Sequence, residues 1–323
     1  MKRLALLLTL ACLLAACGSE SAPPSRPALP LAGALTDPAA VPIPAPPETT
    51  VPEPTTPETE PPVLRELRLP AGMESDLTDP NAQQLLTQIA ALCDGAKLSA
   101  VCMMPDGTLY YAVGADILYP AASTLKPLFC RYLMDNGGDL TVEIPLGEIT
   151  RPSSTGGFTD ADAAFPAEVL MENAVRFSDS MAYLALHRYY GAKGFNAWLK
   201  TVGISGMRLP NTFEYTDITA RQLSIGMAYI LRRDGESDDH RLMDWLKTTD
   251  FDRAIARGTE YPIAQKYGFE GGNLGFHHTA VIGADPPYIL TVMSKLNPNA
   301  DDITPFEEIT RLSDALHGLI HRK

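Results

Sequence analysis

A proline-rich stretch divides this chain and limits what each part of it can fold into. Residues 21–62 contain 14 prolines and no aromatic residue, so they cannot bury a hydrophobic core. The composition predicts a stiff, polyproline-like tether with a reach of up to about 130 Å at ~3.1 Å per residue. Mucin-like decoration is an alternative for the same stretch. We place the tether at residues 18–74, and expect the folded part of the chain to follow it.

The residues before the tether have the pattern of an export signal. Met1, Lys2 and Arg3 precede an apolar run, residues 4–16, that is too short to span a bilayer as a helix. The run ends in the letters LAACG, which resemble the bacterial lipobox. This resemblance implies a lipoprotein signal over residues 1–17, with Cys17 lipidated; an ordinary cleavage site with an incidental Cys17 is the alternative. We therefore expect an exported chain that is lipid-anchored on the outer face of the membrane.

The remaining residues, 75–323, are enough for one large domain with a substantial core. The net charge of −13 and the absence of a basic stretch argue against nucleic-acid binding. A small molecule or peptide is the expected partner, and we expect the chain to be a monomer.

Cysteine and histidine usage gives no sign of a metal site or of another cofactor. Beyond the signal peptide and Cys17, the chain has Cys93, Cys102 and Cys130. Three cysteines allow at most one internal disulfide, and the short separation of Cys93 and Cys102 permits one without requiring it. The six histidines do not have zinc-ligand spacing with cysteines or carboxylates.

Hydrophobic periodicity predicts an α+β fold in three layers, α/β/α. Asp79 and Pro80 have the pattern of a helix start, and a predicted hairpin follows at 98–104 and 108–113. Further strands are expected near the end of the chain at 263–269, 279–283 and 288–293, before a last helix at 305–320. Helical periodicity fills the middle, at 125–133, 167–177, 181–190, 194–202 and 219–231.

This order predicts an antiparallel five-stranded sheet made from both ends of the domain. The N- and C-terminal helices would flank it, and an all-helical subdomain would be inserted between the two halves. The active cleft would lie between the sheet and the helical part.

One pair of residues in this region has the spacing needed for nucleophilic catalysis. Ser123 and Lys126 are three positions apart, so on a helix both side chains project from one face. Burial and a second nearby cation would favour the neutral amine, which could then accept the serine proton. A helix that begins at Ser123 would also present free backbone N–H groups to a developing oxyanion.

The segment around this pair resembles the nucleophile segment of class A β-lactamases and penicillin-binding proteins. Residues 119–126 read YPAASTLK, residues 178–180 read Ser-Asp-Ser where that family has Ser-Asp-Asn, and residues 266–268 read Lys-Tyr-Gly where it has Lys-Thr-Gly. Residues 194–199 and 219–223 continue the likeness in the same order, over nearly the whole domain.

The resemblance implies a role for each matched residue. Ser123 would form an acyl-enzyme, Lys126 would activate it, and Ser178 would pass a proton to the leaving nitrogen. Lys266 would attract the substrate carboxylate and hold the Ser178 hydroxyl, and the backbone N–H groups of Ser123 and Phe269 would form the oxyanion hole. The substrate-binding set is Ser180, Lys266, Tyr267, Gly268 and Phe269. The alternative makes Ser178 a helix N-cap and Lys266 a solvated strand residue.

Several positions depart from the family's pattern. Ser180 is too short for both contacts that the family's asparagine makes, and the Tyr267 ring would occupy space that a ligand normally uses. The candidate for the base that activates water in deacylation is Glu214, on a loop that looks shortened; a solvated loop carboxylate is its other interpretation. His277 and His278 stand where the family often has a carboxylate-binding cation, and they would either substitute for it or pack in the core.

Three functions are therefore compatible with the sequence. The first is a β-lactamase-like serine hydrolase that opens β-lactams through an acyl-serine. The second is a D-Ala-D-Ala carboxypeptidase that acts on peptidoglycan stem peptides, and it is favoured if Glu214 is not a base. The third is a catalytically impaired lipoprotein that binds the cell wall, suggested by Ser180 and Tyr267.

Overall fold

The computed structural model describes residues 69–136, 138–147, 158, 163–211, 215–270 and 275–322. These residues belong to one unit of the chain, Leu64–Lys323. The predicted signal peptide with Cys17, most of the predicted tether, and Glu214 lie outside the described residues. Within the described ranges, no helix is long and apolar enough to cross a membrane.

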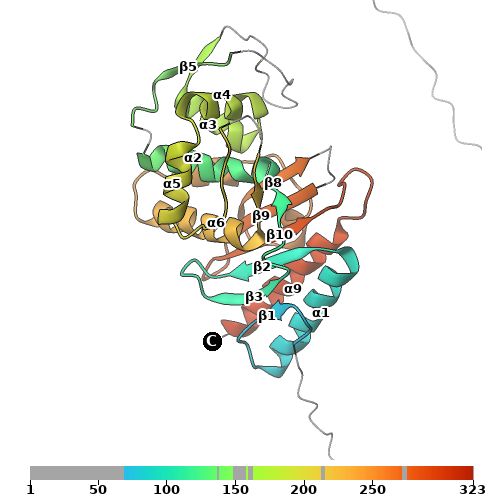
Figure 1. The fold of residues 1–323 in the computed structure, drawn as a ribbon. Helices are drawn as coiled ribbons and strands as arrows, with labels where there is room; N and C mark the ends of the chain where they lie inside the picture. Colours follow the sequence, from blue (N-terminus) through green and yellow to red (C-terminus); the bar gives the residue numbers. More distant parts are fainter. Residues whose placement is uncertain are drawn as a thin grey trace, which may run out of the picture. The chain divides into compact units, whose positions relative to one another are not determined.

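An antiparallel sheet built from both ends of this unit forms the centre of the fold (Figure 1). Its strand order is β1-β3-β2-β10-β9-β8, and every neighbouring pair is antiparallel. The strands are β1 (Met73–Glu74), β2 (Ser99–Met103), β3 (Leu109–Val113), β8 (Ile263–Glu270), β9 (Gly275–Ile282) and β10 (Tyr288–Ser294). The predicted antiparallel sheet is thus confirmed, and β1 adds a sixth strand that the sequence analysis does not predict.

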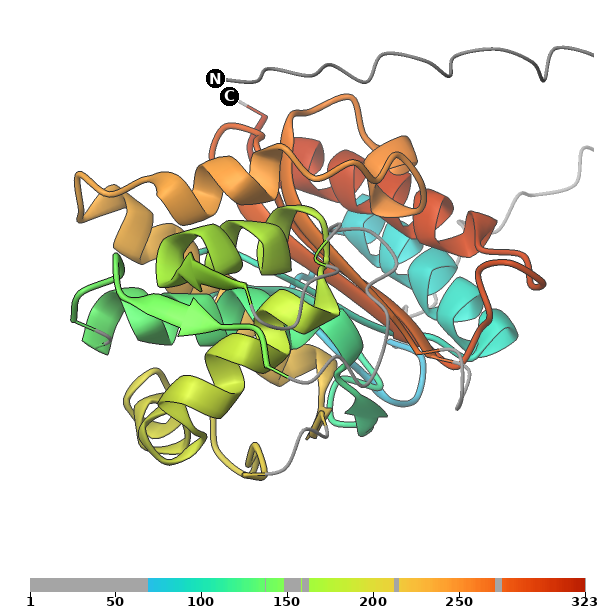
Figure 2. The ribbon, with the colours of Figure 1, turned by 90° about the horizontal axis from the view of Figure 1, so that it is seen from above.

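Helices cover both faces of the sheet, as Figure 2 shows from above. Helices α1 (Pro80–Ala96) and α9 (Thr304–Ile320) pack together on one face. On the other face, α6 (Ala220–Gly235) contacts β2, β9 and β10. Because both faces are covered, every residue of β9 and β10 is buried.

The start of α1 follows the predicted pattern. The Asp79 side chain accepts hydrogen bonds from the backbone N–H groups of Asn81 and Ala82, at 2.8 and 3.0 Å. Pro80 occupies the first helical position, where its missing N–H group would have no helical partner.

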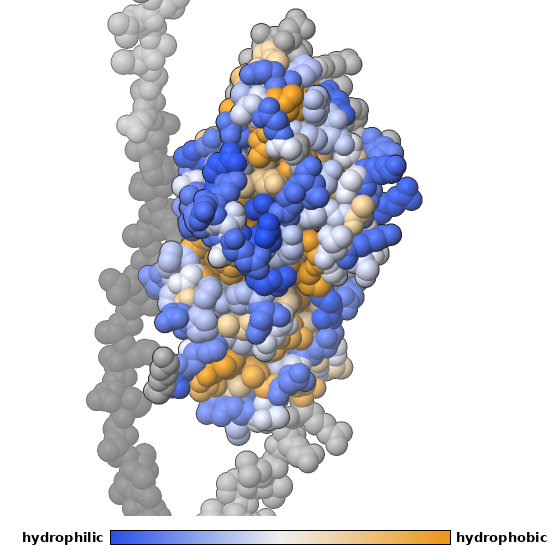
Figure 3. All heavy atoms as spheres, turned by 90° about the vertical axis from the view of Figure 1, so that its left-hand side faces the viewer, coloured by the Kyte–Doolittle hydropathy of each residue, from blue (hydrophilic) through white to orange (hydrophobic). Residues whose placement is uncertain are grey.

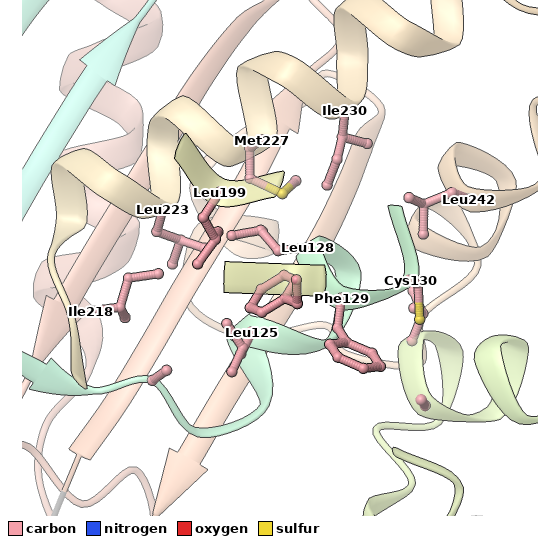
Figure 4. Close-up of a cluster of buried hydrophobic side chains, with 14 of the residues drawn as sticks. Leu125, Leu128, Phe129, Cys130, Leu199, Ile218, Leu223, Met227, Ile230 and Leu242 are labelled. Carbon is pink, nitrogen blue, oxygen red and sulfur yellow. The ribbon is translucent and has the colours of Figure 1, made fainter. Parts of the chain in front are cut away.

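The inserted subdomain lies between the two halves of the sheet in sequence. It is mainly helical, but the prediction that it is all-helical is wrong, because β5 (Glu143–Pro145) and β6 (Ala164–Pro166) pair as a separate two-stranded antiparallel sheet. Figure 4 shows its core, in which Leu128, Leu199 and Met227 meet from three different helices. Full burial of such side chains contributes roughly 1.5–3 kcal/mol each. The helical elements of this subdomain, apart from α6, are the 3₁₀ turn η1 (Ala122–Leu125), α2 (Lys126–Asn136), α3 (Ala167–Arg176), α4 (Ser180–Tyr190), α5 (Lys193–Thr201) and the short helix α7 (Arg241–Lys247).

A largely buried carboxylate connects helices α2, α5 and α6. Asp135 of α2 accepts hydrogen bonds from the Arg131 guanidinium at 2.8 Å, from Trp198 Nε1 of α5 at 3.0 Å and from the Tyr229 hydroxyl of α6 at 2.9 Å. Its side chain is only 10% exposed. These hydrogen bonds compensate the cost of desolvating the Asp135 carboxylate and fix the relative orientation of the three helices.

The folded part begins earlier than the sequence predicts. The predicted tether includes Met73 and Glu74, but these residues pair with Val113 and Ala112 of β3. The Glu74 carboxylate also accepts a 2.7 Å hydrogen bond from Arg221 of α6. A two-residue edge strand forms only by pairing with its partner strand, so it has no periodicity that the sequence could show. The predicted start of the folded domain at residue 75 is therefore too late, because the domain includes Met73 and Glu74.

Hydrophilic side chains cover most of the face that Figure 3 shows, and hydrophobic colour is confined to small patches. In the described part of the chain, the large hydrophobic residues that are exposed are Ile117, Leu118, Tyr189 and Tyr261. Isolated exposed apolar residues are common on folded proteins and do not by themselves indicate a partner.

Candidate active site

Ser123 lies in η1, between the short strand β4 (Tyr119–Pro120) and α2. Strand β4 pairs with β7 (Asp217–Ile218), and the Ala121 N–H donates to Thr216 O at 2.9 Å. Ala122, directly before the serine, has a φ of 46°, which is uncommon for a residue with a side chain. The backbone at Ser123 is therefore held in a tight turn by contacts from outside the turn.

The sheet edge contacts this turn at Gly268. A Cβ atom added to Gly268 would be 2.9 Å from Ser123 N, 3.0 Å from Thr124 N and 3.1 Å from Ala122 Cβ. A side chain would push the strand away, so the absence of one lets the edge strand β8 approach Ser123. Phe269 follows Gly268 on β8, and its part in an oxyanion hole stays a prediction.

Lys126 begins α2 and is completely buried. Its Nζ donates to the Ser178 carbonyl oxygen at 2.6 Å and lies 3.5 Å from Ser180 Oγ. Burial lowers the pKa of Lys126 to about 7, an effect that the carboxylate of Asp179 opposes. The amine therefore exists in large part as the neutral form near neutral pH, as a proton acceptor must.

The loop before α4 presents Ser178 to both lysines. Asp179, and not Ser178, is the N-cap of α4: its side chain accepts from Ala182 N at 2.8 Å. Ser178 has a φ of 56°, and its hydroxyl lies 2.9 Å from Lys266 Nζ. The alternative that Ser178 is only a helix cap is thus wrong, and the strained backbone turns its hydroxyl towards the second lysine.

Lys266 is a buried residue of β8 and not a solvated one. Its Nζ donates to the Ser178 hydroxyl and, at 3.0 Å, to the Tyr267 carbonyl oxygen. Burial and the nearby Lys126 lower the pKa of Lys266 well below its usual value. A substrate carboxylate that approached Lys266 would reverse this effect by stabilising the ammonium form.

Together these contacts form a connected polar chain near Ser123. It runs from Lys126, three residues after Ser123, through Ser178 to Lys266, and it joins α2, the α4 loop and β8. Lys126 contacts the carbonyl oxygen of Ser178, and Lys266 contacts its hydroxyl. A neutral Lys126 amine can take a proton from a serine hydroxyl, and the Ser178 hydroxyl can deliver one to a leaving group. The sequence analysis predicts Ser123 and these three partners but misses the buried Asp179, although an Asp directly before a helical segment is the ordinary signal of an N-cap.

The two substituted motif positions have different surroundings. Ser180 Oγ makes a long contact, 3.5 Å, with Lys126 Nζ. The half-buried Tyr267 ring stacks on Phe251, with centroids 4.1 Å apart, and lies 4.5 Å from Lys266 Nζ. Tyr267 therefore adds an aromatic surface beside the second lysine.

His277 and His278 pack inside the sheet. His277 Nε2 lies 2.9 Å from Pro120 O, and His278 Nε2 lies 2.7 Å from Gln265 Oε1. Both are fully buried, and burial lowers their pKa values to about 4 and about 3. Of the two alternatives for these histidines, packing is the one observed. Strand β9 begins at Gly275, four residues before the predicted start. The sequence did not predict this part of the strand because polar histidines are not expected inside a buried strand.

Cys93, Cys102 and Cys130 are buried free thiols, so the bridge that the sequence permitted is not formed. Burial raises the pKa of Cys93 and of Cys130 to about 12 in each case. Over the described ranges, no group of three or more histidine, cysteine or acidic side chains could hold a metal ion.

The sequence model described as the beta-lactamase enzyme family matches residues 81–319, which include every element of the polar chain. The chain belongs to this family. Its members are serine hydrolases of the β-lactamase and penicillin-binding-protein type.

Solved structures support the fold. PBP-A is 20% identical, with a TM-score of 0.62 over 74% of this chain and 96% of that one. An ancestral class A β-lactamase is 22% identical, with a TM-score of 0.62 over 72% and 99% of the two chains. A β-lactamase from Xanthomonas campestris is 18% identical, with a TM-score of 0.62 over 73% and 98%. No curated protein sequence matches the chain.

Proposed function

We propose that this chain is a serine hydrolase that opens β-lactam rings through an acyl-Ser123 intermediate. The observation that carries the proposal is the buried amine of Lys126, whose pKa of about 7 suits a general base, three residues after the serine. The family match over residues 81–319 supports the same chemistry.

In the proposed reaction, Lys126 accepts the Ser123 proton while Ser123 Oγ bonds to the lactam carbonyl carbon. The oxyanion is stabilised by the backbone N–H groups of Ser123 and Phe269. The lactam C–N bond then breaks, and Ser178 passes its hydroxyl proton to the nitrogen while Lys266 holds that hydroxyl at 2.9 Å. Ser178 takes a proton from the Lys126 ammonium in return, which restores the neutral amine. Water finally cleaves the Ser123 ester and releases the acid.

A D-Ala-D-Ala peptidase that acts on peptidoglycan is the second candidate, and it is favoured if Glu214 does not activate water. In the part of the chain that the structure describes, the groups that accept from Lys126 Nζ are the Ser178 carbonyl and the Ser180 hydroxyl. Neither is a carboxylate that could activate water, and the proposed base Glu214 lies outside the described residues.

Labelling with a fluorescent penicillin tests both candidates. A point mutant of PBP-A is described as an acyl-enzyme complex with penicillin G, so the probe suits this fold. We expect the full chain to form a covalent label that is absent from Ser123→Ala, as seen by gel and mass spectrometry. A label that is lost within seconds would indicate a β-lactamase, and a persistent one a peptidase. No Ser123-dependent label would instead favour the non-catalytic wall-binding protein.

We also propose that the chain is exported and held at the outer face of the membrane by a lipid on Cys17. The short apolar run before Cys17 and the proline-rich tether after it support this. Feeding bacterial cells that produce the chain with a radiolabelled fatty acid should label the full chain and not Cys17→Ser. Equal labelling of both would contradict the anchor at Cys17.

A further inference from the structure

Four side chains that can donate an electron pair to a cation meet near the end of the chain. The Tyr110 hydroxyl oxygen of β3 lies 3.1 Å from His317 Nδ1 and 2.5 Å from His321 Nε2. The sulfur of Met104 lies 2.9 Å from the same oxygen. Two imidazole nitrogens, a phenol oxygen and a thioether sulfur therefore surround one small volume.

The two histidines are spaced as a chelating pair on a helix. His317 lies in the last turn of α9, and His321, four residues later, is the C-cap of that helix. Their rings are on one side of the helix, with centroids 4.5 Å apart. Two histidines at this spacing are a common pair of metal ligands. The His317 ring also stacks on Tyr288, with centroids 4.9 Å apart, which holds its orientation.

The charges around this cluster favour a cation. The C-terminal end of a helix carries a partial negative charge, and the cluster is at that end of α9. The carboxylates of Asp285 and Asp314 also interact electrostatically with His317. Burial raises the pKa of the Tyr110 hydroxyl above its ordinary value, so the phenol keeps its proton until a cation displaces it.

The cluster has a buried side and a side open to solvent. Tyr110 and His317 are 3% and 2% exposed, whereas Met104 and His321 are partly exposed. An ion can therefore reach the donor atoms from solvent without unfolding of the domain. Imidazole suits copper and zinc, and a thioether sulfur selects copper, so this donor set fits copper best.

We propose that His317, His321 and Tyr110 form a binding site for a copper ion, with the sulfur of Met104 as a further ligand. Cu(II) takes the place of the phenol proton, which passes to the solvent, and the oxidation state of the ion does not change. The bound ion ties the end of α9 to the β2–β3 hairpin and so stabilises the fold.

This inference is independent of the proposed hydrolase activity. Tyr110 belongs to the core that the sheet forms with α1 and α9, whereas Leu125, beside the Ser123 turn, belongs to the core of the inserted subdomain. The copper site therefore does not depend on acylation of Ser123.

Titration of the full chain with copper(II) chloride, followed by calorimetry in a buffer that does not bind copper, tests the site. We expect one ion per chain and weaker binding of zinc(II) chloride. The melting temperature should rise by about 5–10 °C when free copper is a hundredfold above its Kd. Coordination by the Tyr110 phenolate should also give a visible charge-transfer band.

Two variants and one control assign the ligands. His321→Ala should weaken copper binding at least about tenfold, since loss even of a group that only orients a ligand costs this much. Tyr110→Phe keeps the ring and should lose the charge-transfer band. His240→Ala is the matched control, because His240 is an exposed histidine whose Nδ1 lies 3.0 Å from Asp234. It should bind copper as wild type does.

Several outcomes would overturn the copper site. Wild type without saturable copper binding would do so, as would undiminished binding by His321→Ala or a charge-transfer band that persists in Tyr110→Phe. Loss of binding in His240→Ala would show that the ion sits on a surface histidine instead. If Tyr110→Phe does not fold, His321→Ala carries the test, because its side chain is partly exposed at the end of α9.

Discussion

Replacing Lys126 with methionine is expected to lower the rate of Ser123 acylation by about 10²–10⁴-fold, the usual contribution of a positioned general base. Methionine has a similar length and fits an apolar site, but it cannot accept the serine proton. Because the amine of Lys126 is fully buried, its removal also ends a desolvation cost, so the free energy of unfolding should not fall. Stopped-flow or gel measurement of penicillin labelling gives the rate, and urea unfolding gives the stability.

The same lysine predicts the pH dependence of acylation. The charged ammonium cannot accept a proton, so the rate should rise with pH as Lys126 loses its proton and should level off above the pKa of about 7. If the acylation rate instead rose with a midpoint near pH 10.5, the ordinary pKa of a lysine, burial would not lower the pKa of Lys126. An acylation rate for Lys126→Met equal to that of wild type would exclude Lys126 as the base.

Gly268→Ala is expected to reduce acylation by roughly 10²–10³-fold, comparable to the loss of one oxyanion-hole donor. The new Cβ atom would be 2.9 Å from Ser123 N and 3.0 Å from Thr124 N. Both neighbours are backbone atoms, so the clash can be relieved only by moving β8 or the turn itself. Either movement changes the separation of the N–H groups that the proposed oxyanion hole needs.

Gly95→Ala provides the control for this substitution. Gly95 lies in α1, and an added Cβ there would meet no atom within 4 Å. We expect normal labelling and a stability equal to wild type or slightly higher, because alanine is the better helix former. Labelling of Gly268→Ala at the wild-type rate would show that β8 can retreat without loss of function.

Much of the fold could be predicted because its elements have strong periodic signals. Asp79 and Pro80 give a helix start, which the structure places at Pro80, and the predicted helices and strands of the sheet and subdomain are all present. The two-residue strand β1 was missed because it exists only through pairing with β3. Helix α7 was missed because seven residues carry too little periodicity.

The sequence by itself also predicted the residues of the candidate site. Spacing placed Ser123 and Lys126 on one face, and the motif order identified Ser178 and Lys266 as their partners. Spacing along the chain could not say how far Ser178 lies from Lys266, since 88 residues separate them and only packing brings them to 2.9 Å.

The tertiary structure alone decided the state of these groups. Complete burial of Lys126, which lowers its pKa to about 7, depends on helices and a sheet edge that come from distant parts of the chain. The same holds for the close approach of Gly268 to Ser123. Residue types and their order are local properties of a sequence, whereas desolvation and close approach arise when separate segments exclude water together.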